Sequence, residues 1–178
     1  MNVVIKNTSL VVDSTAGNAI IAERYGFLTK EGFIVISDAD VRVISAFDAV
    51  NATDLVYVTG SGALLSICSG NGSSSVLYDE IYSRKGIVSG GCVCVEEGSV
   101  YIDSLDDSLK CFGETLLSGG FLTASTKKAA INSALTEIKG GRTEIARSSV
   151  GIKGCRLSIA DGSVKITSNE NAINLSVT

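Results

Sequence analysis

The chain has 178 residues, 45% of them hydrophobic, and a net charge of −4 without a basic run, which excludes the phosphate-neutralising surface of nucleic-acid-binding proteins. Histidine, proline and tryptophan are absent, so the commonest general base, the histidine-containing zinc sites and the best aromatic stacking platform are excluded as well. No apolar run approaches the roughly 18 residues of a membrane helix, and the N-terminal residues lack the order of a secretion signal, so we expect no membrane insertion and no signal peptide in this chain.

Short alternating runs recur along the chain, and each unit starts with a small residue followed by an apolar one. These steps are Ala19-Ile20, Ala49-Val50, Gly86-Ile87, Ser108-Leu109, Ala130-Ile131, Gly151-Ile152 and Ala172-Ile173. Their successive spacings are 30, 37, 22, 22, 21 and 21 residues. A fixed period in this range indicates a stacked repeat, and the two longer spacings predict loop insertions at about residues 23–31 and 70–85.

Each unit carries two short strands, whose apolar residues we expect to point inward. The predicted inward positions are Ile34/Ile36 then Val41/Val43, Val93/Val95 then Val100/Ile102, Leu117 then Leu122, Ile138 then Ile145, and Leu157/Ile159 then Val164/Ile166. Between the strands lie corners that need a permissive backbone, at Gly98-Ser99, Gly119-Gly120, Gly140-Gly141 and Asp161-Gly162.

An apolar ladder decides between an antiparallel meander and a stack of parallel coils. Its members are Ile20, Val50, Ile87, Leu109, Ile131, Ile152 and Ile173. Because a stack of coils places like residues over like, the ladder favours an all-β fold, a right-handed parallel β-helix (solenoid). The prediction is one domain over residues 1–178, with about seven coils of 21–22 residues and the two loop insertions.

Four stretches carry a family resemblance in their order along the chain. They are the Ser-rich insertion that ends in Lys85-Gly86-Ile87, then residues 103–109 (DSLDDSL), 117–120 (LSGG) and 146–154 (ARSSVGIKG). They resemble the right-handed β-helix carbohydrate-binding domains of anaerobic plant-fibre-degrading bacteria, which look like small polysaccharide lyases. The resemblance implies an extracellular or cell-surface protein, a polysaccharide partner of the pectin or cellulose type, and calcium held at aligned acidic turns.

The residues that precede each step are the places where such calcium would bind. They are Asn18, Asp48, Lys85, Asp107, Ala129, Val150 and Asn171, of which two are carboxylates. Asp106, Asp107 and Asp48 are the candidate metal ligands, because calcium takes several hard oxygen ligands. The alternative interpretation is that aspartate is simply a good turn residue. Three lysines, Lys85, Lys127 and Lys128, place positive charge where a cation would lie.

Two pairs of residues are candidates for binding the sugar itself. Tyr78 and Tyr82 lie in the long insertion, either as the lip of a groove or as anchors that hold the loop to the coil wall. Lys110 and Lys153 occupy equivalent positions in two units. They are either sugar contacts or solvated strand-edge charges that discourage aggregation. Without tryptophan, a groove for a single polysaccharide chain is favoured over a platform for crystalline cellulose.

Five cysteines are present, and Cys92 and Cys94 form the one close pair. If the valines beside them point inward, both sulfurs point outward on one strand, with Cα atoms about 6.5 to 7 Å apart, at or beyond the limit for an unstrained disulfide. The odd count indicates small packing residues in a reducing setting.

Three functional hypotheses follow. The resemblance implies a non-catalytic carbohydrate-binding module. The alternative is a structural, self-assembling β-solenoid, because the open ends of such a stack invite end-to-end pairing. The third is a polysaccharide lyase, which would use a lysine or arginine as its base, and no residue of the sequence is marked as catalytic.

Overall fold

The computed structural model describes residues 1–24, 32–76 and 81–176. In this part of the chain all regular structure is β, and no helix occurs that could cross a membrane. Eighteen strands form two sheets, one of eleven strands and one of seven. Most of the insertion expected at residues 23–31 lies outside the described residues.

The eleven-stranded sheet has a main path of eight strands and a shorter row of three beside it. The main path consists, in spatial order, of β1 (Val3–Lys6), β4 (Phe33–Ser37), β7 (Leu55–Thr59), β10 (Cys92–Val95), β12 (Leu109–Leu117), β14 (Ala129–Ile138), β16 (Val150–Ile159) and β18 (Asn171–Leu175). The shorter row, β3 (Ile20–Ala22), β6 (Val50–Ala52) and β9 (Ile87–Ser89), joins the main path where β9 pairs with β12.

The seven-stranded sheet lies opposite the eleven-stranded sheet, and its strands also follow one another in chain order. Its strands are, in spatial order, β2 (Ser9–Ser14), β5 (Asp40–Ser45), β8 (Leu64–Ser69), β11 (Ser99–Ser104), β13 (Phe121–Thr126), β15 (Arg142–Arg147) and β17 (Ser163–Ile166).

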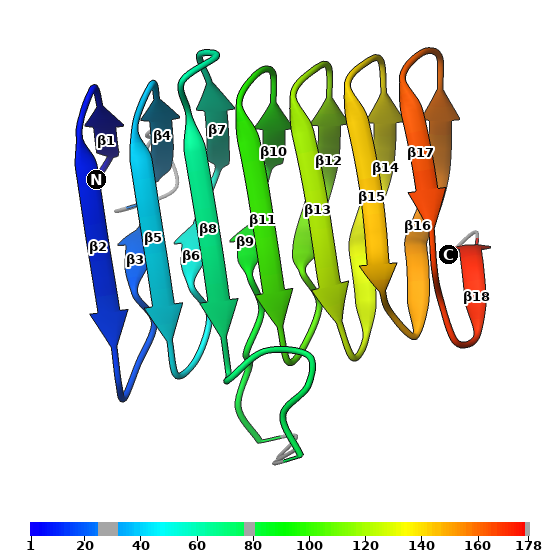
Figure 1. Ribbon diagram of the computed structural model, residues 1–178, viewed down its shortest axis with the longest axis horizontal. Coiled ribbons are helices and arrows are strands. Elements are labelled where there is room, and N and C mark those ends of the chain that lie inside the picture. The colour runs from blue at the N-terminus through cyan, green and yellow to red at the C-terminus, as the bar shows by residue number, and fades with distance from the viewer. Residues whose placement is uncertain (25–31, 77–80, 177–178) are drawn as a thin grey trace.

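The chain alternates between the two sheets, and each passage, called a coil below, adds its strands beside those of the passage before (Figure 1). Every strand pairing in the described residues is parallel, for example β4 with β7 and β11 with β13. The all-β class and the parallel pairing are thereby confirmed. The strands of two coils were not predicted from the sequence. They are β1 and β2 in one coil and β7 and β8 in the other, each coil with one strand in either sheet.

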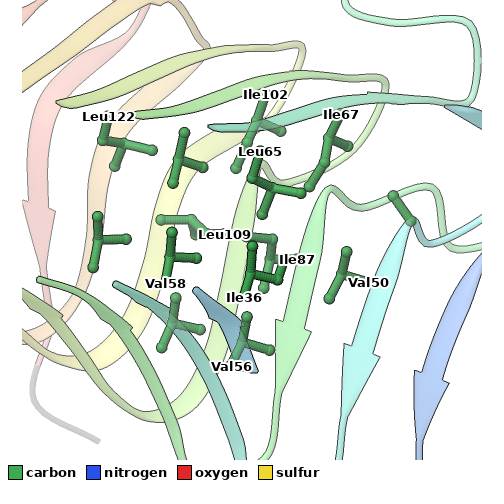
Figure 2. Packing of buried hydrophobic residues seen from close by; sticks show 14 of the residues in the cluster. Ile36, Val50, Val56, Val58, Leu65, Ile67, Ile87, Ile102, Leu109 and Leu122 are labelled. Atoms are coloured by element: carbon green, nitrogen blue, oxygen red, sulfur yellow. The ribbon is translucent and has the colours of Figure 1, made fainter. Parts of the chain in front are cut away.

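The predicted apolar ladder is in register across seven strands. The Cα pairings run Ile20↔Val50, Val50↔Ile87, Ile87↔Leu109, Leu109↔Ile131, Ile131↔Ile152 and Ile152↔Ile173. From Ile20 to Ile152 the side chains are buried, and Figure 2 shows Val50, Ile87 and Leu109 within the core. Opposing positions such as Leu65 and Ile102 come from the other sheet, so the core fills the space between the two sheets.

The predicted inward positions are buried in four of the five strand pairs, and the fifth is corrected. In that pair Ile159 is 48% exposed, and Leu157, Val164 and Ile166 are only partly buried. The reason is that β18 pairs only with the first half of β16, so no described strand covers the second half or β17 on that side.

The corner glycines have the backbone that the sequence predicts. Gly98, Gly120, Gly141 and Gly162 have φ values of 78°, 65°, 72° and 95°, in the left-handed region that favours glycine. A Cβ on Gly141 would lie 2.4 Å from the carbonyl oxygen of Gly120, so neighbouring corners also approach too closely for a larger residue.

Candidate functional site

An acidic corner lies between β11 and β12, where Asp106 and Asp107 form the turn. The Asp106 side chain is 13% exposed, and its Oδ2 accepts a hydrogen bond from Lys85 Nζ at 2.8 Å. Lys128 Nζ lies 3.5 Å from its Oδ1. Burial alone would raise the pKa of Asp106, but the hydrogen bonds from Lys85 and from the Asp107 amide and the two lysine charges outweigh burial and lower it. Asp106 is therefore a charged group that two ammonium groups already neutralise.

Asp107 starts a chain of hydrogen bonds that leads across the eleven-stranded sheet. Its Oδ1 accepts a hydrogen bond from the Ala129 backbone N–H at 3.0 Å, and its Oδ2 accepts one from Asn132 Nδ2 at 2.8 Å. Asn132 Oδ1 in turn accepts a hydrogen bond from Lys110 Nζ at 3.1 Å. The lysine is thus held in place by a neighbouring strand instead of moving freely in solvent.

A lysine–asparagine strip, made of Lys110, Asn132, Lys153 and Asn174, runs over the outer surface of β12, β14, β16 and β18. The four residues are Cα partners on successive strands. Parallel strands lie about 4.8 Å apart, so the two lysines lie about 9.6 Å from each other along the stack. The equivalence of Lys110 and Lys153 that the sequence predicts is confirmed as a structural register.

Two hollows meet at the strip and share Asn132 and Lys153. One, of about 430 Å³, reaches the acidic corner and includes Asp106, Asp107 and Lys128 in its lining. The other, of about 400 Å³, includes Lys110 and Phe112. The sequence-predicted residues Asp106, Asp107, Lys110 and Lys153 therefore line one continuous charged surface.

Phe112 belongs to this surface and was not predicted from the sequence, and the same holds for Asn132 and Asn174. Phe112 is 67% exposed, and Lys110 Nζ lies 5.0 Å from the centre of its ring. Phe112 points outward beside Lys110 because side chains alternate along β12, and it lies where the register between β12 and β14 shifts, between Cys111 and Glu114. The available signal was strand alternation, since Phe112 follows Lys110 by two residues and therefore shares its outward face.

Asp48 lies apart from the strip, at the base of the long insertion. It is 6% exposed, and its Oδ1 accepts hydrogen bonds from Ser83 Oγ at 2.6 Å and from the Lys85 backbone N–H at 2.8 Å. Asp48 therefore fastens the returning limb of the insertion, as a turn aspartate does.

Of the two tyrosines of the insertion, Tyr78 lies outside the described residues. Tyr82 stacks on Phe47 with ring centres 4.8 Å apart, and the Arg84 guanidinium lies 5.8 Å from its ring centre. Half of Tyr82 is exposed. The structure therefore places Tyr82 against the coil wall, away from Lys110 and Lys153, whose hollows it does not line.

The predicted calcium ligands Asp106 and Asp107 already have hydrogen-bonding or charged partners, which a calcium ion would have to replace. Within the described residues no three cysteine or acidic side chains converge as a metal-binding group. A calcium ion at Asp106 would have to displace Lys85 and Lys128, and at Asp107 it would compete with two N–H donors. Calcium at Asp106, Asp107 and Asp48 stays a prediction.

The cysteines are free thiols, and Cys92 and Cys94 lie half-buried on the outer side of β10, as predicted. Burial raises the pKa of Cys92 to about 12, with further contributions from Cys94, Cys111 and Glu114. This thiol is therefore protonated and unreactive at neutral pH.

Comparison with known proteins identifies the family. The family model described as "Carbohydrate-binding domain-containing protein" matches residues 1–130, which include Asp106, Asp107, Lys110 and Phe112. No curated protein matches the chain, and no solved structure matches it. Because the match covers most of the sequence, the chain belongs to the carbohydrate-binding domain-containing protein family.

Proposed function

We propose that this protein is a non-catalytic polysaccharide-binding module that binds a single acidic glycan chain of the pectin type along the lysine–asparagine strip. The observation that carries the proposal is the hydrogen-bonded series Asp107–Asn132–Lys110 beside the exposed ring of Phe112. A preorganised cation and an aromatic face are the two elements that recognise an acidic pyranose, since one binds its carboxylate and the other its apolar ring face.

The spacing of the strip supports a linear ligand. In an extended glycan with a twofold repeat, alternate sugars present the same side, so carboxylates of every second sugar would meet Lys110 and Lys153, about 9.6 Å apart. Asn132 and Asn174 lie between and beyond the lysines and offer amide donors and acceptors to the sugars' hydroxyl groups. A cellulose-type chain would use the ring and the amides but would leave the lysines without partners.

The groups on the strip favour binding over catalysis. A lyase needs a basic group that takes a sugar proton and a cation that stabilises the developing charge. Lys110 is instead a hydrogen-bond donor to Asn132 at 3.1 Å, which suits an electrostatic contact. Incubation with polygalacturonate should therefore release no unsaturated, ultraviolet-absorbing products, and their appearance would revive the lyase hypothesis.

The binding test is affinity electrophoresis of the whole chain in gels that contain polygalacturonate. The double variant Lys110→Ala/Lys153→Ala should bind about tenfold more weakly, because exposed ion pairs contribute about 0.2–1 kcal/mol each. Its matched control is Lys139→Ala/Lys165→Ala, which removes two exposed lysines that pair with Glu137 and Glu144 away from the strip. Equal retardation of both variants would show a nonspecific charge effect and refute the site.

Calcium, location and fold handedness complete the proposal. Running the same gels with calcium and with a chelator tests the ion, and stronger binding with calcium would support ligation at Asp106 and Asp107.

We propose an extracellular or cell-surface location from the family resemblance, which fractionation of the source cells tests. We propose a right-handed β-helix, because crossovers between parallel strands of one sheet are right-handed in about 98% of cases, and an experimental density map tests it.

Self-association stays the alternative to glycan binding. Light scattering across a range of protein concentrations tests it, and a mass that stays monomeric at the highest concentration would exclude it. The same measurement in polygalacturonate-free buffer also shows whether the gel assay measures one molecule or an assembly.

A further inference from the structure

A hollow of about 580 Å³ lies outside the lysine–asparagine strip, on the outer surface of the seven-stranded sheet. This is the sheet of long strands that faces the viewer in Figure 1. Its lining comes from four neighbouring strands, β5, β8, β11 and β13. Among the residues that the structure describes, neither the predicted site residues nor the acidic corner belong to its lining.

The hollow is a trough because small and large side chains alternate between strands. The outward residues of β8 that line the hollow are Ser66 and Cys68, whereas Arg42 on β5 and Tyr101 on β11 are the Cα partners of Ser66 on either side. Asp103 is the corresponding partner of Cys68 on β11. The two walls are two strands apart, about 9.6 Å, so the trough runs along β8 with Ser66 and Cys68 as its floor.

The chemistry of the trough suits an uncharged, hydroxyl-rich ligand. Tyr101 is 45% exposed and presents a ring face, while Arg42 and Asp103 give one positive and one negative charge on opposite walls. Asp103 is fixed in place, because its Oδ1 accepts a hydrogen bond from the Ser73 backbone N–H at 2.7 Å. Burial and then the Asp103 charge raise the pKa of the Cys68 thiol while Arg42 lowers it, so the floor is neutral and both charges face it.

A peptide strand would find little to bind in this trough. The backbone groups of β8 are already paired with β5 and β11 on its two sides, so the floor offers only side chains. Hydroxyl groups of Ser66 and, beyond the Tyr101 ridge, of Thr123 and Ser125 remain for the ligand. A ring face beside hydroxyls and a balanced charge pair is the lining that orients a sugar.

We propose that this trough is a second carbohydrate subsite, which binds uncharged pyranose units of a glycan chain that lies along β8. Tyr101 stacks on a sugar ring, and Arg42 and Asp103 bind hydroxyl groups on its two edges. The inference extends the proposed function to a different sheet and a different sugar chemistry. It makes the protein bivalent, able to bridge an acidic glycan on the strip and a neutral one in the trough.

The test is affinity electrophoresis of the whole chain in a soluble, uncharged β-glucan and, in parallel, in polygalacturonate. Tyr101→Ala should weaken retardation by the β-glucan about tenfold, the loss expected for one aromatic contact, and should leave polygalacturonate binding unchanged. Ser66→Tyr should have the same effect by filling the trough, without removing any ligand contact of the walls. Phe112→Ala is the matched aromatic control and should weaken only polygalacturonate binding.

Three results would overturn the second subsite: no retardation of the unmodified protein by the β-glucan, wild-type retardation of both trough variants, or loss of β-glucan binding in Lys110→Ala/Lys153→Ala alone. Thermal unfolding of each variant separates lost binding from lost folding. If polygalacturonate binding fails while Tyr101-dependent β-glucan binding is present, the acidic strip is refuted and the trough is supported.

Discussion

Replacing Ile131 by alanine tests the stacked register from which both proposed surfaces derive. Ile131 is 0% exposed and lies between Leu109 and Ile152 in the ladder. Removing its buried methyl and methylene groups should cost about 2–5 kcal/mol, as transfer and cavity costs add. Ile173, the last member of the same ladder, is 47% exposed. The same replacement there should cost about 1 kcal/mol, because roughly half of the side chain is already in water and no closed cavity results.

The assays are thermal unfolding and equilibrium urea unfolding of both variants, each followed by far-ultraviolet circular dichroism and by tyrosine fluorescence. For a chain of this length each kcal/mol lowers Tm by about 2–4 °C, so Ile131→Ala should lower Tm by at least about 4 °C and Ile173→Ala by less. Coincidence of the two probes matters, because stacks of repeats can unfold in parts. Equal losses for the two variants would refute the reasoning, since they would mean that Ile131 is no more enclosed than Ile173.

Three further predictions concern the acidic corner, the coil corners and the cysteines. Asp106→Asn should destabilise the protein most at neutral pH. Because folding lowers the pKa of Asp106, the stability that its carboxylate contributes is complete above the unfolded-state pKa and is lost as pH falls through the folded-state pKa. A difference in urea midpoints that does not change with pH would contradict this. Gly141→Ala should cost more than about 1 kcal/mol because φ is 72°, whereas Gly17→Ala, whose Cβ would meet nothing nearer than 3.7 Å, should be close to neutral in the same unfolding assay. Cys155, the exposed thiol, should react first with a thiol reagent at pH 8, and Cys92 slowly because its pKa is about 12; fast labelling that persists in Cys155→Ser would count against this order.

The local pattern of apolar and polar residues was sufficient to predict the repeat and its register. Alternation of apolar and polar residues indicates a strand, and a spacing of 21 or 22 residues sets which residue lies over which, so the ladder from Ile20 to Ile173 could be predicted position by position. The corner glycines could be predicted for the same reason, because a left-handed φ is a property of one residue. Lys110 and Lys153 followed from the register alone.

What the sequence by itself did not determine depends on side chains that meet across coils. The pairing of Asp106 with Lys85 and Lys128 joins residues 21 and 22 positions apart, and the path of the insertion decides whether Lys85 returns to that corner. The register shift between Cys111 and Glu114 is likewise a feature of the paired strands that the repeat period does not show.

The trough on the seven-stranded sheet is the clearest case that only the tertiary structure decided. Ser66 and Cys68 are unremarkable in sequence, and they form a floor only because Arg42 and Tyr101, 24 and 35 residues away from Ser66, stand on the strands beside them. The sequence determines the stack, because strand and corner preferences are local. The binding surfaces are determined by the folded stack. A hollow forms where small side chains on one strand lie between larger ones on strands that are neighbours only in space.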